Sequence, residues 1–228
     1  MPLDRLPDAR IDRLLSLRAA LDGLLSLVAP PFCWGCGVHA RGGPLCAGCR
    51  TALEWLGPAS VELRGVETWA PVAYDGPARE LVKALKYRGA QAVAETMAAQ
   101  IAAGAPAPMR LGAVLVPVPL HPRRERKRGF NQARVLADAL VARLGVEVRD
   151  SLERRGSSAT QVGRPREERL RAATGSVALR AGTTAPGAAL LVDDVVTTGA
   201  TLATCAAALR AAGSREVAAL AYARTPSH

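Results

Sequence analysis

Residues 189–201 read ALLVDDVVTTGAT, and this stretch decides the fold. Four apolar residues run into the adjacent carboxylates Asp193 and Asp194, and a turn rich in threonine and glycine leads into an Ala/Leu-rich segment. The pattern predicts a buried strand, a loop and a helix, in that order. Backbone N–H groups and threonine hydroxyls in such a loop can surround a phosphate, because Gly199 permits a tight turn. The stretch therefore predicts a phosphate cradle at the carboxyl end of a central strand.

The two carboxylates suit a sugar diol or a hydrated Mg²⁺ carried by the ligand. The alternative, an ordinary turn with an acidic surface pair, is disfavoured because buried carboxylates are costly without partners. All thirteen residues together resemble the signature with which type I phosphoribosyltransferases bind 5-phosphoribosyl-1-pyrophosphate (PRPP). The resemblance implies that Asp193 and Asp194 are the catalytic pair and bind the ribose 2′- and 3′-hydroxyls. It also implies that the 5′-phosphate lies on Thr197, Thr198, Gly199, Ala200 and Thr201.

Length and composition limit the number of domains, and the distribution of charge indicates the class of ligand. The chain has 228 residues and is 49% hydrophobic, which suffices for one large domain or a domain with an appendage. Thirty Lys and Arg against twenty Asp and Glu leave +10, of which residues 121–130 carry +4 and residues 149–171 carry +3. Such focusing favours a binding site for pyrophosphate or nucleic acid, with Arg-rich solvated loops as the alternative.

The N-terminal segment is expected to form an amphipathic helix over residues 1–29, because apolar residues recur there at helical spacing. Five charged residues interrupt the apolar region that a signal peptide requires: Arg10, Asp12, Arg13, Arg18 and Asp22. The chain also lacks an uncharged apolar run of about 18 residues. We therefore expect a cytoplasmic protein with no membrane span, whose N-terminal helix packs on its own protein.

Two CxxC pairs follow, Cys33 with Cys36 and Cys46 with Cys49, separated by nine residues. Two such knuckles present four thiolates to one tetrahedral Zn²⁺, so we expect a structural zinc ribbon. A pair of disulfides is the alternative, disfavoured by the cytoplasmic assignment and by the strain of closing so short a loop.

Strands and helices alternate along the remaining chain. Strands are expected near residues 66–74, 111–119, 176–179, 188–193 and 217–222, and helices over residues 77–89, 91–103, 132–144 and 201–212. Residues 121–132 are expected to form a basic loop. This order is typical of an α/β fold, a parallel sheet flanked by helices with its ligand at the carboxyl ends of the strands.

The basic loop repeats the strand-loop-helix plan of residues 189–201. In phosphoribosyltransferases the corresponding loop binds pyrophosphate, the leaving group. The resemblance therefore implies pyrophosphate contacts from Arg124 and Arg128, to which Lys86 and Arg88 at the end of the preceding helix contribute. Cations at a helix C-terminus are also common for reasons of the helix dipole alone.

The order of several motifs strongly resembles the ComF (competence protein F) family from about residue 30 to the end. These motifs are the CxxC pairs, LKYRG at residues 85–89, VPVPL at 116–120, RGFNQ at 128–132 and the PRPP loop. The resemblance implies a four-cysteine zinc ribbon over residues 30–65, a type I phosphoribosyltransferase-like domain over residues 66–228 and an association with DNA uptake in natural competence. Arg164, Ala172 and Val177 depart from the family pattern, which commonly has Leu, Asn and Phe there.

Two functions from different classes stay open. In the first, PRPP binds with Mg²⁺ and a nitrogen acceptor displaces its pyrophosphate; purine-salvage members of the fold usually carry a carboxylate where Thr197 stands, which argues against 6-oxopurines. In the second, a competence factor senses PRPP or a nucleotide, handles single-stranded DNA or docks competence-machinery proteins without catalysis. An aromatic content of 4% limits base-stacking platforms.

Overall fold

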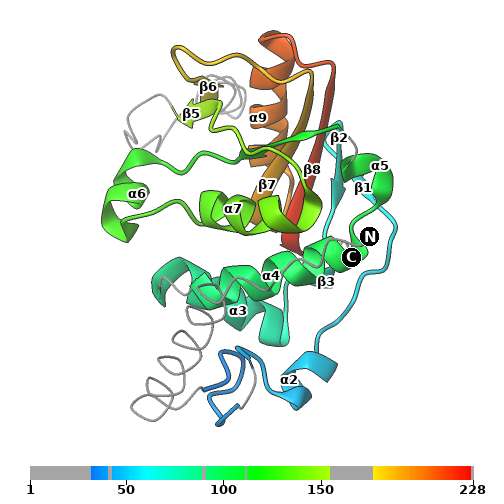
Figure 1. The fold of residues 1–228 in the computed structure, drawn as a ribbon, viewed down its shortest axis with the longest axis vertical. Helices are drawn as coiled ribbons and strands as arrows, with labels where there is room; N and C mark the ends of the chain where they lie inside the picture. The colour runs from blue at the N-terminus through cyan, green and yellow to red at the C-terminus, as the bar shows by residue number, and fades with distance from the viewer. Residues whose placement is uncertain (1–31, 41–42, 89–90, 111, 155–176, 227–228) are drawn as a thin grey trace, which may run out of the picture.

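The computed structural model describes residues 32–40, 43–88, 91–110, 112–154 and 177–226 (Figure 1). The helix expected over residues 1–29 lies outside the described residues. So do Arg164 and Ala172, two of the three departures from the family pattern.

The main sheet has the order β1-β2-β8-β7-β4, and β3 also pairs with β8. Its strands are β1 (Val61–Leu63), β2 (Val66–Trp69), β3 (Val72–Ala73), β4 (Val114–Pro117), β7 (Ala188–Val196) and β8 (Glu216–Arg224). All the pairs are parallel except β1 with β2. The expected α/β class with a mainly parallel sheet is therefore confirmed.

Helices cover both faces of this sheet (Figure 1). On one face Leu190 and Val192 of β7 share a buried cluster with residues of α3 (Gly76–Arg88), α4 (Gln91–Gly104) and α7 (Gln132–Leu144). On the other face Ala189 and Leu191 share a cluster with residues of α9 (Ala200–Ala211). Because strand side chains alternate between faces, the continuous apolar run before Asp193 buries both sides of β7.

Two predicted segments differ from the structure in their secondary structure. The strand expected over residues 66–74 is divided into β2 and β3 at Pro71, which has no N–H to donate to the ladder and whose carbonyl accepts the Leu56 N–H at 2.9 Å. The basic loop expected over residues 121–132 contains a helix, α6 (Pro122–Arg128). The His121 side chain caps its start, and Gly129, with φ of 82°, ends it.

A second, two-stranded sheet pairs β5 (Leu152–Arg154) with β6 (Val177–Leu179) antiparallel. The strand expected near residues 176–179 thus forms outside the main sheet. Val177, the third departure from the family pattern, is buried in the cluster that contains α9 residues.

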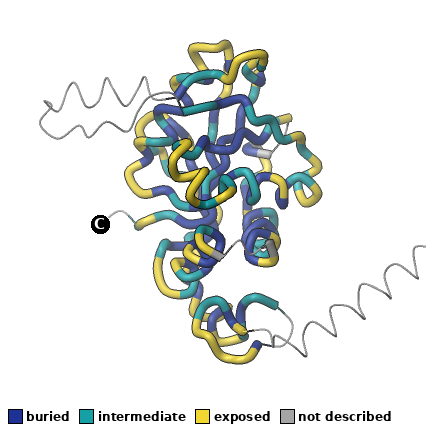
Figure 2. Tube along the Cα trace, turned by 90° about the vertical axis from the view of Figure 1, so that its left-hand side faces the viewer, coloured by how far each residue is buried: buried dark blue, intermediate teal, exposed yellow. Residues whose placement is uncertain are grey.

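The two CxxC pairs and α2 (Ala47–Thr51) lie at the end of the molecule beyond α3 and α4 (Figure 1), which is the lower end of the tube in Figure 2. Cys33, Leu45, Cys49 and Leu53 belong to the same buried cluster as Leu81 and Leu85 of α3. Since β1 pairs with β2 of the main sheet, we propose a ribbon boundary near residue 60 in place of residue 65. A short helix, α5 (Ala107–Arg110), precedes β4. Within the described ranges, no helix combines the length and the apolar character that crossing a membrane requires.

Candidate functional site

A cavity of about 660 Å³ opens at the carboxyl ends of β4 and β7. β4 pairs with β7 only as far as Pro117 opposite Val192, after which the Val118 N–H bonds the Val192 carbonyl at 2.9 Å. Pro119 has no N–H with which to continue the ladder. The edge of β7 that faces β4 is therefore unpaired with β4 at Asp193 and Asp194, and both carboxylates line the cavity.

Asp194 is the centre of a network that joins four elements. Its side chain is 3% exposed, and its Oδ2 lies 2.7 Å from the Lys86 Nζ of α3. Gln132 of α7 donates its Nε2 hydrogen to Asp194 Oδ1 at 3.3 Å and accepts a hydrogen bond from Arg128 Nη1 of α6. Lys86 thus compensates the buried charge, while Gln132 links Asp194 to Arg128.

Arg128 is also held by Tyr87, which follows Lys86 on α3. Its guanidinium carbon lies 5.5 Å from the centroid of the Tyr87 ring, within cation–π range. Tyr87 is 77% exposed and lines the cavity, which is unusual for so large an apolar ring. The arginine is therefore oriented from two sides before any ligand arrives.

Asp193 is half-buried, and its Oδ1 accepts the Asp194 N–H at 2.8 Å. Burial raises the pKa of the Asp193 carboxyl well above its ordinary value, the Asp194 charge raises it further, and Lys86 opposes both. A carboxyl of this kind binds a ligand hydroxyl or cation strongly, because either one relieves the cost of its buried charge.

This raised pKa predicts how stability depends on pH. Between the ordinary and the raised pKa, the folded chain keeps the Asp193 proton and the unfolded chain has lost it. The stability that this carboxyl contributes is therefore fully present below about pH 4, the ordinary carboxyl pKa, and is lost as the pH rises through the raised pKa. Asp193→Asn is expected to raise the free energy of unfolding at pH 7 by about 1 kcal/mol and to flatten its pH dependence. Urea unfolding of both chains between pH 4 and 8 tests this, and an Asn variant less stable than the parent at pH 7 contradicts it.

The predicted phosphate loop follows Asp193 and Asp194. Thr197, Thr198 and Ala200 are exposed, and Gly199 has φ of 72°. Gly199 is the N-cap of the twelve-residue helix α9. Because glycine has no side chain, it gives the first N–H groups of α9 no side-chain acceptor. Thr201 is the one residue of the predicted loop that lines the cavity; Thr197, Thr198, Gly199 and Ala200 precede it in the chain and are not among the lining residues. This arrangement suits an anion at the helix N-terminus.

The basic side of the cavity includes five cations: Lys86, Arg124, Lys127, Arg128 and Arg154. Of the predicted pyrophosphate contacts, Lys86, Arg124 and Arg128 line the cavity, and the Arg88 side chain lies outside the described residues. His121 Nε2 and Arg154 Nε are buried without a hydrogen-bond partner among the described residues, although both side chains line the cavity. Five cations against two carboxylates favour an anionic ligand.

Sequence reasoning missed several lining residues. Gln132 belongs to the RGFNQ motif and begins α7, so a polar residue at a helix start was a usable signal. Tyr87 lies within LKYRG beside the predicted Lys86, but nothing in the sequence shows that its ring meets Arg128. Arg154 enters from β5, a strand too short to be predicted.

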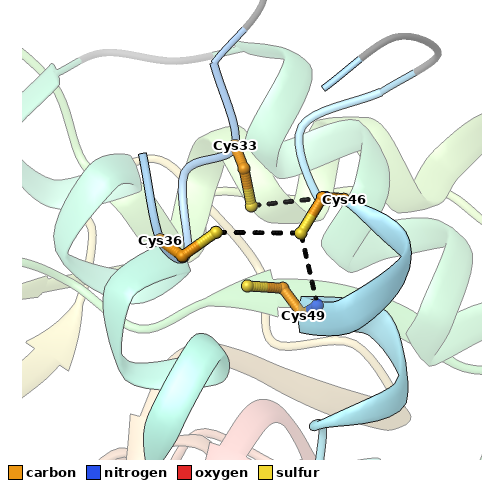
Figure 3. Close-up of side chains that lie close together, drawn as sticks. All are labelled: Cys33, Cys36, Cys46 and Cys49. Carbon is orange, nitrogen blue, oxygen red and sulfur yellow. Dashed lines mark hydrogen bonds between the residues drawn. The ribbon is translucent and has the colours of Figure 1, made fainter. Parts of the chain in front are cut away.

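The four ribbon cysteines form a second cluster, in which all the Sγ atoms lie within 4.8 Å of one another (Figure 3). Cys33 Sγ accepts the Cys46 N–H at 3.3 Å, and Cys46 Sγ accepts the Cys49 N–H at 3.4 Å. Burial acts to raise the pKa of the Cys33 thiol, but backbone N–H donors, with that of Cys46 foremost, outweigh it and lower the pKa to about 6. The cluster therefore fits a metal-binding ribbon, and four thiolates are the donor set of structural Zn²⁺.

Close packing in the ribbon depends on glycine. A Cβ atom at Gly35 would lie 2.8 Å from Cys49 Sγ, so a side chain there would displace a cysteine of the cluster. The glycine within the first CxxC pair thus lets the two knuckles approach each other.

The chain is similar to two curated competence proteins. It is 38% identical over 102 residues to competence protein ComFC of Streptococcus pneumoniae (strain ATCC BAA-255 / R6), a match that covers 45% of this chain and 44% of that protein. It is 26% identical over 213 residues to competence protein F of Haemophilus influenzae, covering 86% of this chain and 91% of that protein. The matched part spans less than half of the first relative's length. The resemblance to the ComF family is confirmed by these matches, whereas no protein-family model matches the chain.

Among solved structures, a hypoxanthine phosphoribosyltransferase from Staphylococcus aureus is 12% identical, with a TM-score of 0.32. The superposition covers 57% of this chain and 60% of that chain.

Proposed function

We propose that this ComF-like chain binds PRPP in the cavity between α6 and the end of β7. The observation that carries the proposal is the convergence of two strand-end carboxylates and five cations on one cavity, beside a helix N-terminus without a side-chain cap. The cavity volume of about 660 Å³ lies in the range of small-molecule sites. A ligand with two anionic ends and a diol between them matches this arrangement, in which the carboxylates lie between a helix N-terminus and a group of cations.

Each part of PRPP has a proposed counterpart in the cavity or in the loop beside it. The 5′-phosphate accepts hydrogen bonds from the backbone and hydroxyls of residues 197–201, and the ribose diol donates to Asp193 and Asp194. The pyrophosphate lies against Arg124 and Arg128, where charge-assisted hydrogen bonds are strongest. Mg²⁺ bound to the pyrophosphate would neutralise part of its charge. Asp193 and Asp194 fit such an ion through their oxygens, although Lys86 already compensates Asp194.

The same arrangement supports transfer of the phosphoribosyl group to a nitrogen acceptor. The bond from C1′ to the pyrophosphate oxygen breaks, pyrophosphate leaves with the electron pair, and a new bond forms between C1′ and the nitrogen, whose proton passes to solvent. Arg124 and Arg128 stabilise the charge that grows on the leaving oxygens, and the carboxylates stabilise the cationic sugar. Thr197 provides no strong base, which favours an acceptor that needs none.

We further propose that the chain acts in natural competence, as the names of its two relatives suggest, in the cytoplasm, where thiols stay reduced and the cysteine cluster holds structural Zn²⁺. The domain plan that we propose keeps the N-terminal helix, the ribbon and the phosphoribosyltransferase-like domain expected from sequence, with the ribbon ending near residue 60. Proteins of the competence machinery are the partners that this role requires.

A non-catalytic factor that handles single-stranded DNA is the second candidate, because α6 is a basic helix with no buried residue. Arg123 and Arg126 on it are exposed and lie outside the cavity lining. A DNA backbone would use them along with Arg124, whereas PRPP in the cavity would not.

Calorimetry and an assay of pyrophosphate release test the first candidate. The parent chain is expected to bind PRPP with Mg²⁺ and to release pyrophosphate with at least one nitrogen acceptor from a panel of bases. Asp193→Asn and Asp194→Asn are each expected to weaken PRPP binding about 10- to 100-fold, because each removes a charged acceptor of the diol. Arg143→Ala, which removes an exposed ion pair with Glu95, serves as the matched control and is expected to change nothing.

The outcomes separate the candidates. PRPP binding without turnover on any acceptor supports a sensor and removes the transferase. No PRPP binding, together with single-stranded DNA binding that weakens steeply with salt and with Arg123→Ala, replaces the first candidate with the second.

A further inference from the structure

The β1–β2 hairpin ends in a strained turn beside the phosphate loop. Its central residues, Arg64 and Gly65, have φ of 53° and 78°, the positive values typical of a type I′ turn. Arg64 is the only non-glycine residue with positive φ in the described part of the chain. Asparagine or glycine is usual at this position, so an arginine there suggests that its side chain serves a purpose that outweighs the strain.

That side chain contacts the phosphate loop. Arg64 Nε donates a hydrogen bond to the Thr198 carbonyl at 3.0 Å, across 134 positions of sequence. The next residue of the loop, Gly199, packs directly on the hairpin, since a Cβ atom there would lie 2.8 Å from the Leu63 Cβ. Arg210 of α9 donates to the Gly65 carbonyl at 3.1 Å, which fixes the hairpin to the helix that follows the loop.

The hydrogen bond from Arg64 orients one peptide group of the loop. No cis peptide occurs among the described residues, so the carbonyl of Thr198 and the N–H of Gly199 point in opposite directions across one planar unit. Because the carbonyl points toward the Arg64 guanidinium, the Gly199 N–H points away from that guanidinium. The first free N–H groups of α9 follow directly in the chain.

We propose that Arg64 is a positioning residue for the 5′-phosphate site. By holding the Thr198 carbonyl, it turns the Gly199 N–H toward the phosphate and preorganises the loop that joins β7 to α9. This inference rests on the proposed function, since it assigns the loop to the 5′-phosphate of PRPP. Arg64 acts on the ligand through the loop and is not itself a catalytic residue.

Arg64→Asn is the decisive variant, because asparagine favours the left-handed turn and its short side chain lacks the guanidinium that reaches Thr198. Its thermal midpoint is expected to equal or exceed that of the parent, while its affinity for ribose 5-phosphate and for PRPP falls about tenfold. Affinity for inorganic pyrophosphate is expected to stay unchanged, since that group lies at the other end of the cavity. Arg64→Lys restores a donor and is expected to recover part of the lost affinity.

Backbone ¹⁵N order parameters of Gly199 and Ala200 in the ligand-free protein give a second readout. They are expected to be lower in Arg64→Asn than in the parent, and unchanged in Arg143→Ala. Equal order parameters, or ribose 5-phosphate affinity equal to that of the parent, overturn the positioning role alone. A parent chain that binds neither phosphoribosyl ligand overturns the proposed function, and the assignment of the loop to the 5′-phosphate falls with it.

Discussion

Replacing Lys86 with methionine is expected to lower the free energy of unfolding by about 3 kcal/mol. Methionine keeps most of the length of the side chain but leaves the Asp194 carboxylate, 3% exposed, without the cation that lies 2.7 Å from it. Removing one partner of a buried ion pair is costly because the other charge stays desolvated and uncompensated. Urea denaturation at pH 7 measures the loss.

The double variant Lys86→Met with Asp194→Asn is expected to recover most of this stability, since the neutral amide needs no counter-ion and Gln132 can still bond it. Lys83→Met is the matched control on the same helix. Lys83 pairs with Glu80 at 2.6 Å, but the two side chains are 46% and 41% exposed, so the change is expected to stay within about 0.5 kcal/mol.

Two results would contradict this account of Asp194. One is a Lys86→Met variant as stable as the Lys83→Met control, and the other is a double variant no more stable than Lys86→Met alone. The double variant also separates folding from function, because it is expected to fold normally and yet to bind PRPP weakly. Lys86 is thus expected to serve stability and the site through the same contact.

Elements with a strong local signal could be predicted from sequence, and weak ones could not. The apolar run before Asp193, together with Gly199, was sufficient to predict β7 and the start of α9 to within a few residues. β1 was missed because Val61–Leu63 is three residues with a central glutamate, and only its pairing with β2 makes it a strand. α6 was expected to be a loop because charge dominates its composition, yet His121 and Gly129 supply both of its caps.

The candidate site divides in the same way. The adjacent carboxylates could be predicted because they belong to a motif that is contiguous in sequence. The link from Asp194 to Gln132 joins residues 62 positions apart, and the contact of Arg64 with Thr198 joins residues 134 positions apart. Such pairs are set by the packing of the sheet and its helices, which periodicity alone does not specify.

Removing the metal that we propose for the cysteine cluster is expected to unfold the ribbon and to lower the thermal midpoint by about 6–12 °C. Binding of structural zinc contributes about 10–16 kcal/mol in small peptides, more than so small a ribbon can replace by packing. Cys49, Leu45 and Leu53 share the buried cluster of α3, so part of that cluster becomes exposed as well. A loss of about 3 kcal/mol produces a shift of this size in a chain of this length.

Two cysteine variants separate the metal from packing. Cys36 is exposed, so Cys36→Ser removes a thiolate ligand at almost no cost in buried surface, and the full midpoint shift is expected together with the loss of about one bound zinc per chain. Cys205 is buried on α9 outside the cluster, so Cys205→Ala is expected to cost some packing and to keep its zinc. Elemental analysis counts the metal, and tryptophan emission, to which Trp34 within the first CxxC pair contributes together with Trp55 and Trp69, follows the ribbon. A metal-free chain with unchanged midpoint and emission would show that the thiols fold without an ion. Residues of α3, the helix that carries Lys86, pack in the same buried cluster as the ribbon. If chelation of the metal also weakens PRPP binding, the ribbon therefore helps to hold Lys86 in the cavity.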